Sequence, residues 1–266
     1  LGLEFAIKGF AGAILGGIIP VPVALGISDE HKLKLLRIAR KLGNPYLYTD
    51  RKTLDRIAIF ANDSQSDGRA TLSGLQQRAF LVDTLADISV AGKAHNAQPD
   101  DTAFIQFSSG STSEPKGIVL THRNILTNAR GAGEAAAFSE QDVTLSWMPL
   151  THDMGLIGMF IMMYAHRMQL NMMPTELFVR RPLLWMQIAA RKRVTITSSP
   201  NFGFRHYLKV LSDRSVADLD LASIRLLFNG AEPISASLAR EFIARLQPAK
   251  LPPQAMYPVY GLAEAT

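Results

Sequence analysis

The second half of the chain alternates between apolar runs typical of β-strands and amphipathic patterns typical of helices. The strand-like runs are residues 102–107, 118–120, 143–148, 168–173, 194–198, 224–228 and 255–259. The helical patterns are residues 123–138, 156–164, 182–191, 202–211 and 237–246. Such alternation favours parallel strands joined by crossover helices, because parallel strands need long connections. The sequence therefore predicts an α/β fold whose mainly parallel sheet is covered by helices on both faces.

The first hundred residues are less regular. We expect helices over residues 3–15 and from Ser28, a possible N-cap, to Leu42. Strands are expected at 18–25 and 46–48, a surface loop at 62–73, and a linker at 96–101. The linker divides the chain into an N-terminal subregion, residues 1–100, and a second subregion, residues 101–266.

Composition narrows the function classes. The chain has no cysteine, which excludes disulfides, thiolate metal sites and cysteine nucleophiles. Its net charge of +5 fits an anionic ligand, but the basic residues are scattered, which disfavours nucleic acid as a partner. Residues 9–28 carry no charge, yet their five glycines and two prolines favour buried elements over a membrane span. We expect a cytoplasmic protein.

A loop rich in hydroxyl groups follows the first strand-like run of the second half. Residues 107–117 read Phe-Ser-Ser-Gly-Ser-Thr-Ser-Glu-Pro-Lys-Gly. Hydroxyls, accessible backbone N–H groups and the charge of Lys116 are the parts that hold the phosphates of a nucleotide. Pro115 stands where a Walker A loop needs glycine, so the loop is not of that type. Taken alone, it could equally be an ordinary mobile surface loop.

The loop resembles the phosphate-binding signature of the adenylate-forming (AMP-binding) superfamily, which includes acyl-CoA synthetases, luciferases and peptide-synthetase adenylation domains. It departs at Ser113, where that family usually has glycine. Three further segments resemble family elements, in the family's order: residues 147–155, 229–233 and 260–266. The amino-acid sequences of these segments, together with Asn201 and Phe202, are most similar to those of the fatty acyl-AMP ligase branch.

The resemblance implies a role for each matching position. Nucleotide binding falls to Ser108, Ser109, Gly110, Ser111, Thr112, Lys116, Gly117, Asn229, Gly230, Ala231, Glu232, Tyr260, Gly261 and Thr266. Substrate binding falls to His152, Met154, Gly155, Asn201 and Phe202, and Glu264 is the magnesium ligand. Lys116, His152 and Glu264 form the implied catalytic set. Each of these positions could instead have a purely structural role. The alternatives are a packed histidine at 152, a simple turn at 229–230, a core tyrosine at 260 and a surface acid at 264.

The implied reaction is the ATP- and Mg²⁺-dependent conversion of a fatty acid, or another carboxylic acid, to acyl-adenylate and pyrophosphate. The acyl group then passes to the phosphopantetheine thiol of an acyl carrier protein. CoA is the alternative acceptor, and a binding module without turnover is the alternative class. The methionine-rich stretch 154–173 could line an acyl tunnel or simply pack the core. We expect the chain to be part of the large N-terminal domain, without the small C-terminal domain that carries the family's adenylation lysine.

Overall fold

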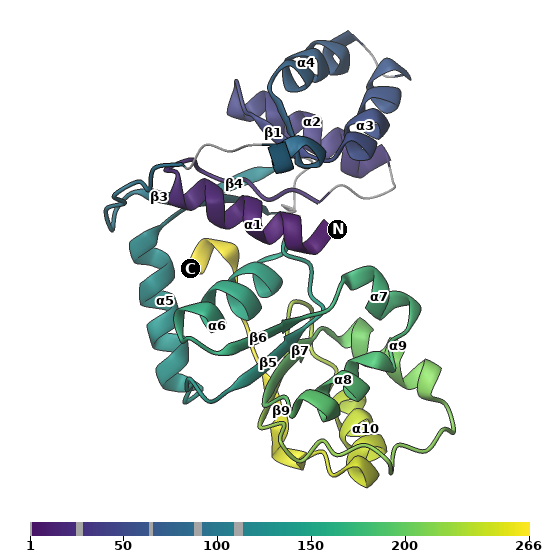
Figure 1. Cartoon of the computed structure of the whole chain (residues 1–266). Helices are drawn as coiled ribbons and strands as arrows, with labels where there is room; N and C mark the ends of the chain where they lie inside the picture. The colour runs from purple at the N-terminus through teal and green to yellow at the C-terminus, as the bar shows by residue number, and fades with distance from the viewer. Residues whose placement is uncertain (1, 25–28, 64–65, 88–91, 109–113) are drawn as a thin grey trace. The chain divides into compact units, whose positions relative to one another are not determined.

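The computed structural model describes residues 2–24, 29–63, 66–87, 92–108 and 114–266 (Figure 1). The chain forms two compact units, Leu1–His122 and Arg123–Thr266. The predicted division after residue 100 lies upstream of this boundary and stays a prediction. No helix among the described residues is both long enough and apolar enough to span a membrane.

The first unit combines helices with two small sheets. Its helices are α1 (Gly2–Leu15), α2 (Asp29–Leu42), α3 (Arg51–Asp63), α4 (Ser66–Gln77) and the 3₁₀ turn η1 (Val82–Asp87). The short strands β1 (Leu47–Thr49) and β2 (Ala79–Leu81) pair in parallel. Leu35, Ile57 and Leu72 form one buried cluster, which joins α2, α3 and α4.

An antiparallel pair carries the loop with the phosphate-binding resemblance. Strand β3 (Thr102–Ser108) pairs with β4 (Lys116–Thr121), and the register places Ser108 opposite Lys116. The predicted strands on both sides of the loop are thus confirmed. Residues 109–113 lie outside the described residues, so the predicted roles of Ser109, Gly110, Ser111 and Thr112, and the departure at Ser113, stay predictions.

A parallel five-stranded sheet forms the centre of the second unit. Its order is β6 (Gln169–Met172), β5 (Val143–Ser146), β7 (Ile196–Ser199), β8 (Leu226–Asn229) and β9 (Met256–Pro258). All four neighbouring pairs are parallel. The α-helices of this unit are α5 (His122–Ala135), α6 (Met162–Ala165), α7 (Thr175–Arg180), α8 (Leu184–Lys192), α9 (Asn201–Leu211) and α10 (Ala236–Leu246). Shorter turns are the π-helix η2 (Met154–Ile161) and the 3₁₀ turns η3 (Gln247–Ala249), η4 (Pro253–Ala255) and η5 (Ala263–Ala265).

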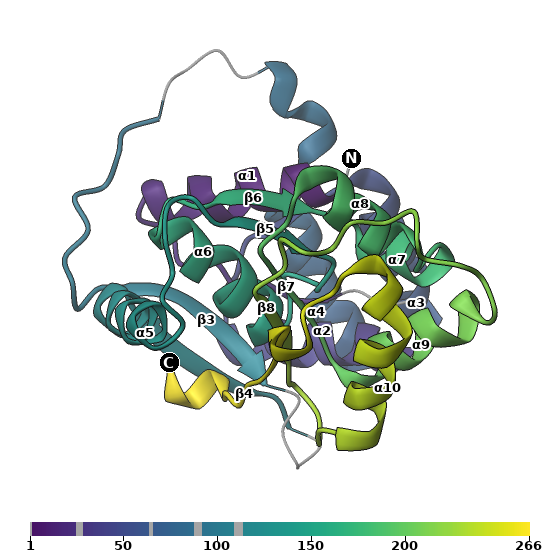
Figure 2. The same ribbon diagram turned by 90° about the horizontal axis from the view of Figure 1, so that it is seen from below.

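Helices cover both faces of this sheet. Figure 2 shows α6 on one side of the strands and α8, α9 and α10 on the other. Side chains along β8 alternate accordingly: Leu227 joins a large aromatic core, and Leu226 and Phe228 join a smaller methionine-rich core. In the aromatic core, the rings of Trp147 and Phe178 stack 3.8 Å apart. The predicted parallel α/β architecture is confirmed.

Two predictions in the first unit are wrong. Residues 18–24 form no strand, because prolines at 20 and 22 supply no N–H donors for a ladder. Instead the carbonyl of Pro20 accepts one bond from the N–H of Ile105, at 3.1 Å. The expected loop at 62–73 contains the end of α3 and most of α4. In α4, Leu72 and Leu75 are buried against α2 and its neighbours, and this packing overrides a weakly periodic sequence.

Candidate functional site

The predicted site segments of the second unit all follow strands of the parallel sheet. Residues 147–155 come after β5, Asn201 after β7, residues 230–233 after β8, and residues 259–266 after β9. The carboxyl ends of parallel strands meet at one edge, which is where ligands bind in open α/β sheets. The fold therefore gathers these distant segments at one edge of the sheet.

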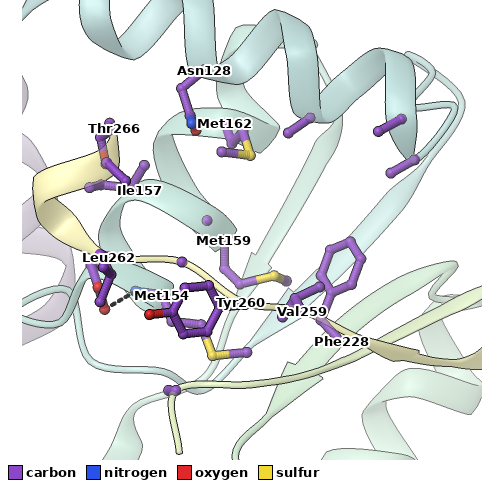
Figure 3. A pocket seen from close by; sticks show the side chains of 18 of the residues that line it. Asn128, Met154, Ile157, Met159, Met162, Phe228, Val259, Tyr260, Leu262 and Thr266 are labelled. Carbon is purple, nitrogen blue, oxygen red and sulfur yellow. Dashed lines mark hydrogen bonds between the residues drawn. The ribbon is translucent and has the colours of Figure 1, made fainter.

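A pocket of about 410 Å³ lies at this edge (Figure 3). The segment that follows β9, the end of β8, and helices η2 and α5 all contribute to its wall. It is lined by Asn128, Ala132, Ala135, Ala136, Phe138, Asp153, Met154, Ile157, Gly158, Met159, Met162, Phe228, Ala231, Tyr257, Val259, Tyr260, Gly261, Leu262, Ala265 and Thr266. Every one of these residues belongs to the second unit.

The π-helix η2 supplies an apolar part of the wall. Met154, Ile157, Gly158 and Met159 come from η2, and Met162 from the helix that continues it. A π-helix of eight residues is rare, and π-helical turns often occur at functional sites. The methionine-rich stretch thus divides: some methionines line the pocket, while Met163, Met168 and Met173 are buried in the core. Met159 does both, since it lines the pocket and is buried in the methionine-rich core. Core packing is thus observed for part of the stretch, and the acyl tunnel stays a prediction.

Gly155 and Gly158 differ in what surrounds them. A Cβ on Gly155 would lie 2.2 Å from the carbonyl oxygen of Pro149, so this glycine permits a close backbone approach. A Cβ on Gly158 would meet no atom within 4 Å, and Gly158 lines the pocket. Gly155, predicted to bind substrate, does not line the pocket, whereas Gly158 does. The predicted contact of Gly155 with substrate stays a prediction.

His152 and Asp153 form a close pair at the start of η2. His152 Nδ1 lies 2.6 Å from Asp153 Oδ1, and the same oxygen accepts the N–H of Met154 at 2.7 Å. The Asp153 side chain caps η2 and lines the pocket. The hydrogen bond from His152 to Asp153 raises the pKa of the imidazole, and this effect outweighs desolvation by burial, which lowers it. Burial alone would raise the pKa of Asp153, but its hydrogen bonds hold that pKa below its ordinary value.

The turn after β8 approaches the end of β9 closely. A Cβ on Gly230 would lie 2.7 Å from the carbonyl oxygen of Val259, so glycine is required by contact. Ala231 adopts a left-handed backbone, with φ of 67°, and lines the pocket. Asn229 is fully buried, and neither polar atom of its side chain has a hydrogen-bond partner among the described residues. The backbone of this turn thus packs closely on the segment that follows β9, and its predicted contact with adenine stays a prediction.

Asn201 and Glu232 hold this turn against helix α9. The amide of Asn201 donates to the carbonyl of Pro233, and its carbonyl oxygen accepts the N–H of Ser235 at 3.3 Å. The Glu232 carboxylate accepts the N–H of Phe202 at 2.7 Å, at the start of α9. None of Asn201, Phe202 and Glu232 lines the pocket. Their predicted contacts with substrate or nucleotide stay predictions, and their observed contacts fix the turn.

The segment after β9 brings an exposed aromatic ring to the pocket. The Tyr260 side chain is 89% exposed, and Tyr260, Gly261 and Thr266 all line the pocket. A free aromatic face at the carboxyl edge of a sheet suits stacking on a flat ring, and this exposure rules out the alternative of a core tyrosine. Glu264 is exposed in the 3₁₀ turn η5 beside the pocket-lining Ala265.

Lys116 and Gly117 belong to the first unit, at the start of β4. The Lys116 side chain is exposed. A Cβ on Gly117 would meet the ring of Phe107 at 3.0 Å, so this glycine permits close packing of β4 on β3. Ser108 ends β3.

The pocket adds residues that sequence reasoning missed. Asp153 was detectable, since it follows a predicted site histidine and begins a helical pattern. Gly158 could be recognised only once η2 was known to be a π-helix. In the sequence, a glycine within an apolar segment does not by itself indicate a pocket. Asn128 comes from α5, which carries no motif.

Comparisons with known proteins bear on this site. The chain matches the AMP-binding enzyme family over residues 9–266. A medium-chain-fatty-acid–[acyl-carrier-protein] ligase of Teredinibacter turnerae is 38% identical over 291 aligned positions, covering 98% of this chain and 45% of that relative. A 4-hydroxyphenylalkanoate adenylyltransferase of Mycobacterium tuberculosis is 31% identical over 270 positions, covering 100% of this chain and 43% of that relative.

Solved structures agree with the fold. The fatty acyl-adenylate ligase from L. pneumophila, in complex with acyl adenylate and pyrophosphate, superimposes with a TM-score of 0.86 at 28% identity. The match covers 100% of this chain and 45% of that one. The chain thus spans less than half the length of each of these relatives.

Proposed function

Because the chain belongs to the AMP-binding enzyme family, we propose that the whole protein activates a fatty acid with ATP, giving acyl-adenylate and pyrophosphate. The acyl group then passes to the phosphopantetheine thiol of an acyl carrier protein. The names of two relatives support a fatty-acid substrate, and one of them also names the carrier protein. The relatives' greater length makes this a proposal for the whole protein.

The observation that carries the proposal is the pocket itself. One part of its wall consists of methionine, isoleucine and phenylalanine side chains, which suit an alkyl chain. Another part carries Asp153, Tyr260 and Thr266, which are polar. Such a pocket takes a ligand with a long apolar tail and a polar head. A fatty acid joined to a nucleotide has this character.

We assign the nucleotide to the segments after β8 and β9. Tyr260 stacks on the adenine, and the turn Asn229–Glu232 presents backbone groups to its edge. Thr266 supplies a hydroxyl near the α-phosphate. Lys116 and the hydroxyls of the loop that follows β3 bind the β- and γ-phosphates. These groups neutralise charge and hold the carboxylate in line with the leaving pyrophosphate, so the protein needs no covalent intermediate of its own.

Glu264 can serve as a magnesium ligand only together with the phosphates of the nucleotide, which would provide the other ligands. Mg²⁺ in nucleotide enzymes is usually held by one or two carboxylates together with substrate phosphates. The described residues contain no group of three or more histidine, aspartate or glutamate side chains placed to hold a metal by themselves. Glu264, an exposed carboxylate beside the pocket, matches this sparse donor set. Magnesium would supply charge neutralisation at the phosphates.

The test is ATP–pyrophosphate exchange by the full-length protein across a saturated series from hexanoate to palmitate, with 4-hydroxyphenylpropanoate alongside. Exchange that rises with chain length and then falls supports a fatty-acid substrate. Exchange with the aromatic acid alone would assign the pocket to arylalkanoates. ATP binding without exchange for any acid would favour the binding-module alternative.

The acceptor needs its own measurement. The full-length protein first forms acyl-AMP from ATP and the fatty acid. A phosphopantetheine-bearing carrier protein or CoA is then added, and the thioester product is quantified. Transfer to the carrier protein supports the proposal. Faster transfer to CoA would favour the acyl-CoA synthetase alternative.

A further inference from the structure

We propose that Asp153 is a positioning residue that holds the His152 imidazole in one orientation and in its cationic form. This inference rests on the proposed function, because it gives the pair a task in acyl-adenylate formation. Asp153 lines the pocket, and His152 is the neighbour through which it acts.

The geometry fixes the carboxylate from two sides. Asp153 Oδ1 lies 2.6 Å from His152 Nδ1 and 2.7 Å from the backbone nitrogen of Met154. The Met154 nitrogen also lies 3.2 Å from His152 Nδ1. An unprotonated nitrogen 2.6 Å from an anionic oxygen would be repelled, so Nδ1 carries a proton and donates it to Asp153. A protonated Nδ1 cannot accept a hydrogen bond, so the N–H of Met154 donates to the Asp153 carboxylate, which is also the nearer of the two atoms.

The other ring nitrogen is left for a ligand. The His152 side chain is 46% exposed, and its Nε2 has no hydrogen-bond partner in the part of the chain that the structure describes. Because the Nδ1–H group donates its hydrogen bond to Asp153, Nε2 is an acceptor in the neutral ring and a donor in the cationic ring. Within the described part of the chain, Asp153 is the charged group that acts on the imidazole, and it raises the pKa of His152 through the hydrogen bond and through its charge. The cationic ring with Nε2–H outward is the form that this pairing favours.

The cationic form of His152 suits the chemistry of adenylation. The substrate carboxylate oxygen bonds to the α-phosphorus of ATP, and the bond from that phosphorus to the bridging oxygen breaks. The electron pair leaves with pyrophosphate, and no proton is transferred. A general base therefore has no task, whereas two anions must be brought together. A cation with a directed N–H donor reduces that repulsion.

Asp153 also caps η2, and a purely structural role must be separated from positioning. Asparagine can still accept the N–H of Met154 through its oxygen, but it carries no charge. Alanine offers neither. Asp153→Asn thus removes the electrostatic effect on His152 and keeps the cap, while Asp153→Ala removes both.

The experiment compares the full-length wild type with Asp153→Asn, Asp153→Ala, His152→Gln and the double variant Asp153→Asn/His152→Gln. Asp213→Asn, which changes an exposed carboxylate just after α9, is the matched control. Acyl-AMP formation is measured from pH 5.5 to 9, together with melting temperatures. For the wild type we expect kcat/KM for the fatty acid to fall as pH rises through the pKa of His152.

Loss of the carboxylate should move this fall to lower pH, because Asp153 keeps the ring protonated at higher pH. At pH 7.5 we expect Asp153→Asn to lose about 10- to 100-fold in kcat/KM, by analogy with the loss seen when the hydrogen-bond partner that orients a metal-ligating histidine is removed. Its melting temperature should stay near wild type, and that of Asp153→Ala should fall. His152→Gln should abolish the pH-dependent fall, and the double variant should be no worse than His152→Gln within about twofold, since the two residues act as one unit.

Several outcomes would overturn the positioning role. An Asp153→Asn variant with the wild-type rate and pH profile is one. A double variant that loses the product of the two single losses is another. The NMR titration of ¹³C-labelled histidine in the wild type, assigned with His152→Gln, needs no variant at position 153; a His152 pKa at or below 6.5, the ordinary value, contradicts the proposal. A wild type that forms no adenylate with any carboxylic acid overturns the proposed function instead, whatever the titration shows.

Discussion

Lys116 offers a clean test of the phosphate assignment, because its side chain is exposed at the start of β4. Lys116→Ala should weaken ATP binding by about 10- to 100-fold, which corresponds to a charged hydrogen bond of about 1.5–3 kcal/mol. The melting temperature should barely change, since exposed substitutions usually alter stability by about 0.5 kcal/mol or less. ATP affinity and thermal unfolding of the full-length protein are the measurements.

The matched control is Lys192→Ala, which removes an exposed cation from the last turn of α8. It should leave ATP affinity unchanged. A large loss of stability in Lys116→Ala with unaltered ATP affinity would assign Lys116 to the scaffold.

Glu264 is tested through the metal. Because one exposed carboxylate contributes only part of a magnesium site, Glu264→Gln should raise the Mg²⁺ concentration needed for half-maximal adenylate formation. The rate at saturating Mg²⁺ should recover at least in part. A magnesium dependence identical to wild type would remove Glu264 from the metal site.

At the scale of the element, η2 supplies an apolar part of the pocket wall. Gly158 faces open space in the wall, with no positive φ to prevent substitution. Gly158→Leu should therefore fill part of the pocket without straining the backbone. Each methylene of the fatty acid displaced from apolar surroundings costs about 0.8 kcal/mol, or about fourfold in kcat/KM. The longest acids should lose most, and short acids should be nearly unaffected.

The control for this variant is Gly131→Leu in α5. A Cβ there also meets nothing within 4 Å, but Gly131 does not line the pocket. Exchange rates across the fatty-acid series separate the two variants. Parallel loss at every chain length, or the same profile in both variants, would show that Gly158 does not limit the acyl chain.

An ion pair between a buried carboxylate and a partly exposed guanidinium lies at the opposite edge of the sheet. Asp142, whose side chain is 4% exposed, accepts bonds from Arg225 Nη2 at 2.6 Å and Nε at 2.8 Å. Thr195 and the N–H of Ser139 complete its shell, and Arg225 also donates to the carbonyls of Ala136 and Ala137. The pair thus links the segment after α5 to residues at the amino ends of β5, β7 and β8.

Arg225→Met should cost about 3 kcal/mol in the free energy of unfolding at pH 7, because it leaves a buried carboxylate unpaired. Burial raises the pKa of Asp142, but the hydrogen bonds from Arg225, Thr195 and Ser139 outweigh it and hold the pKa below its ordinary value. A depressed carboxyl pKa stabilises the fold at pH above that ordinary value, and the contribution is lost as pH falls through the folded-state pKa. The difference between wild type and variant should therefore shrink in acid.

Urea unfolding at several pH values measures this difference. The exposed pair Arg167–Glu140 supplies the control, since Arg167→Met should cost about 1 kcal/mol or less. Equal losses in the two variants would contradict a special role for the Asp142–Arg225 pair.

Elements of the second unit were predictable because burial produces continuous apolar runs. Strands β5, β7 and β8 coincide with such runs, and their parallel order follows from the helices between them. The first unit was less predictable: α4 is held by two buried leucines, and residues 18–24 lose their strand to prolines. The turn 229–233 was visible as a motif, but the contact of Gly230 with Val259 was not, since it joins segments far apart in the sequence.

At the scale of the whole molecule, the chain matches less than half the length of the relatives described above. It spans 45% of the length of the acyl-carrier-protein ligase that it resembles. From the family resemblance, we expect the adenylation lysine to lie outside the matching motifs. A reaction driven by positioning loses rate steeply when a single charge-stabilising donor is removed, typically by about 100- to 1000-fold. Water entering an open site weakens the remaining charge contacts further.

We therefore predict that the 266-residue polypeptide, produced by itself, forms negligible acyl-AMP. The pocket and the Tyr260 segment lie within it, so weak nucleotide binding should remain. Incubation with ATP, Mg²⁺ and a long-chain fatty acid, followed by quantification of acyl-AMP, is the measurement, with the full-length protein assayed in parallel. Circular dichroism and thermal unfolding of the same preparation establish that it is folded. Turnover near that of the full-length protein would show that these residues already hold every group the reaction needs, and the role expected of the adenylation lysine would then be wrong.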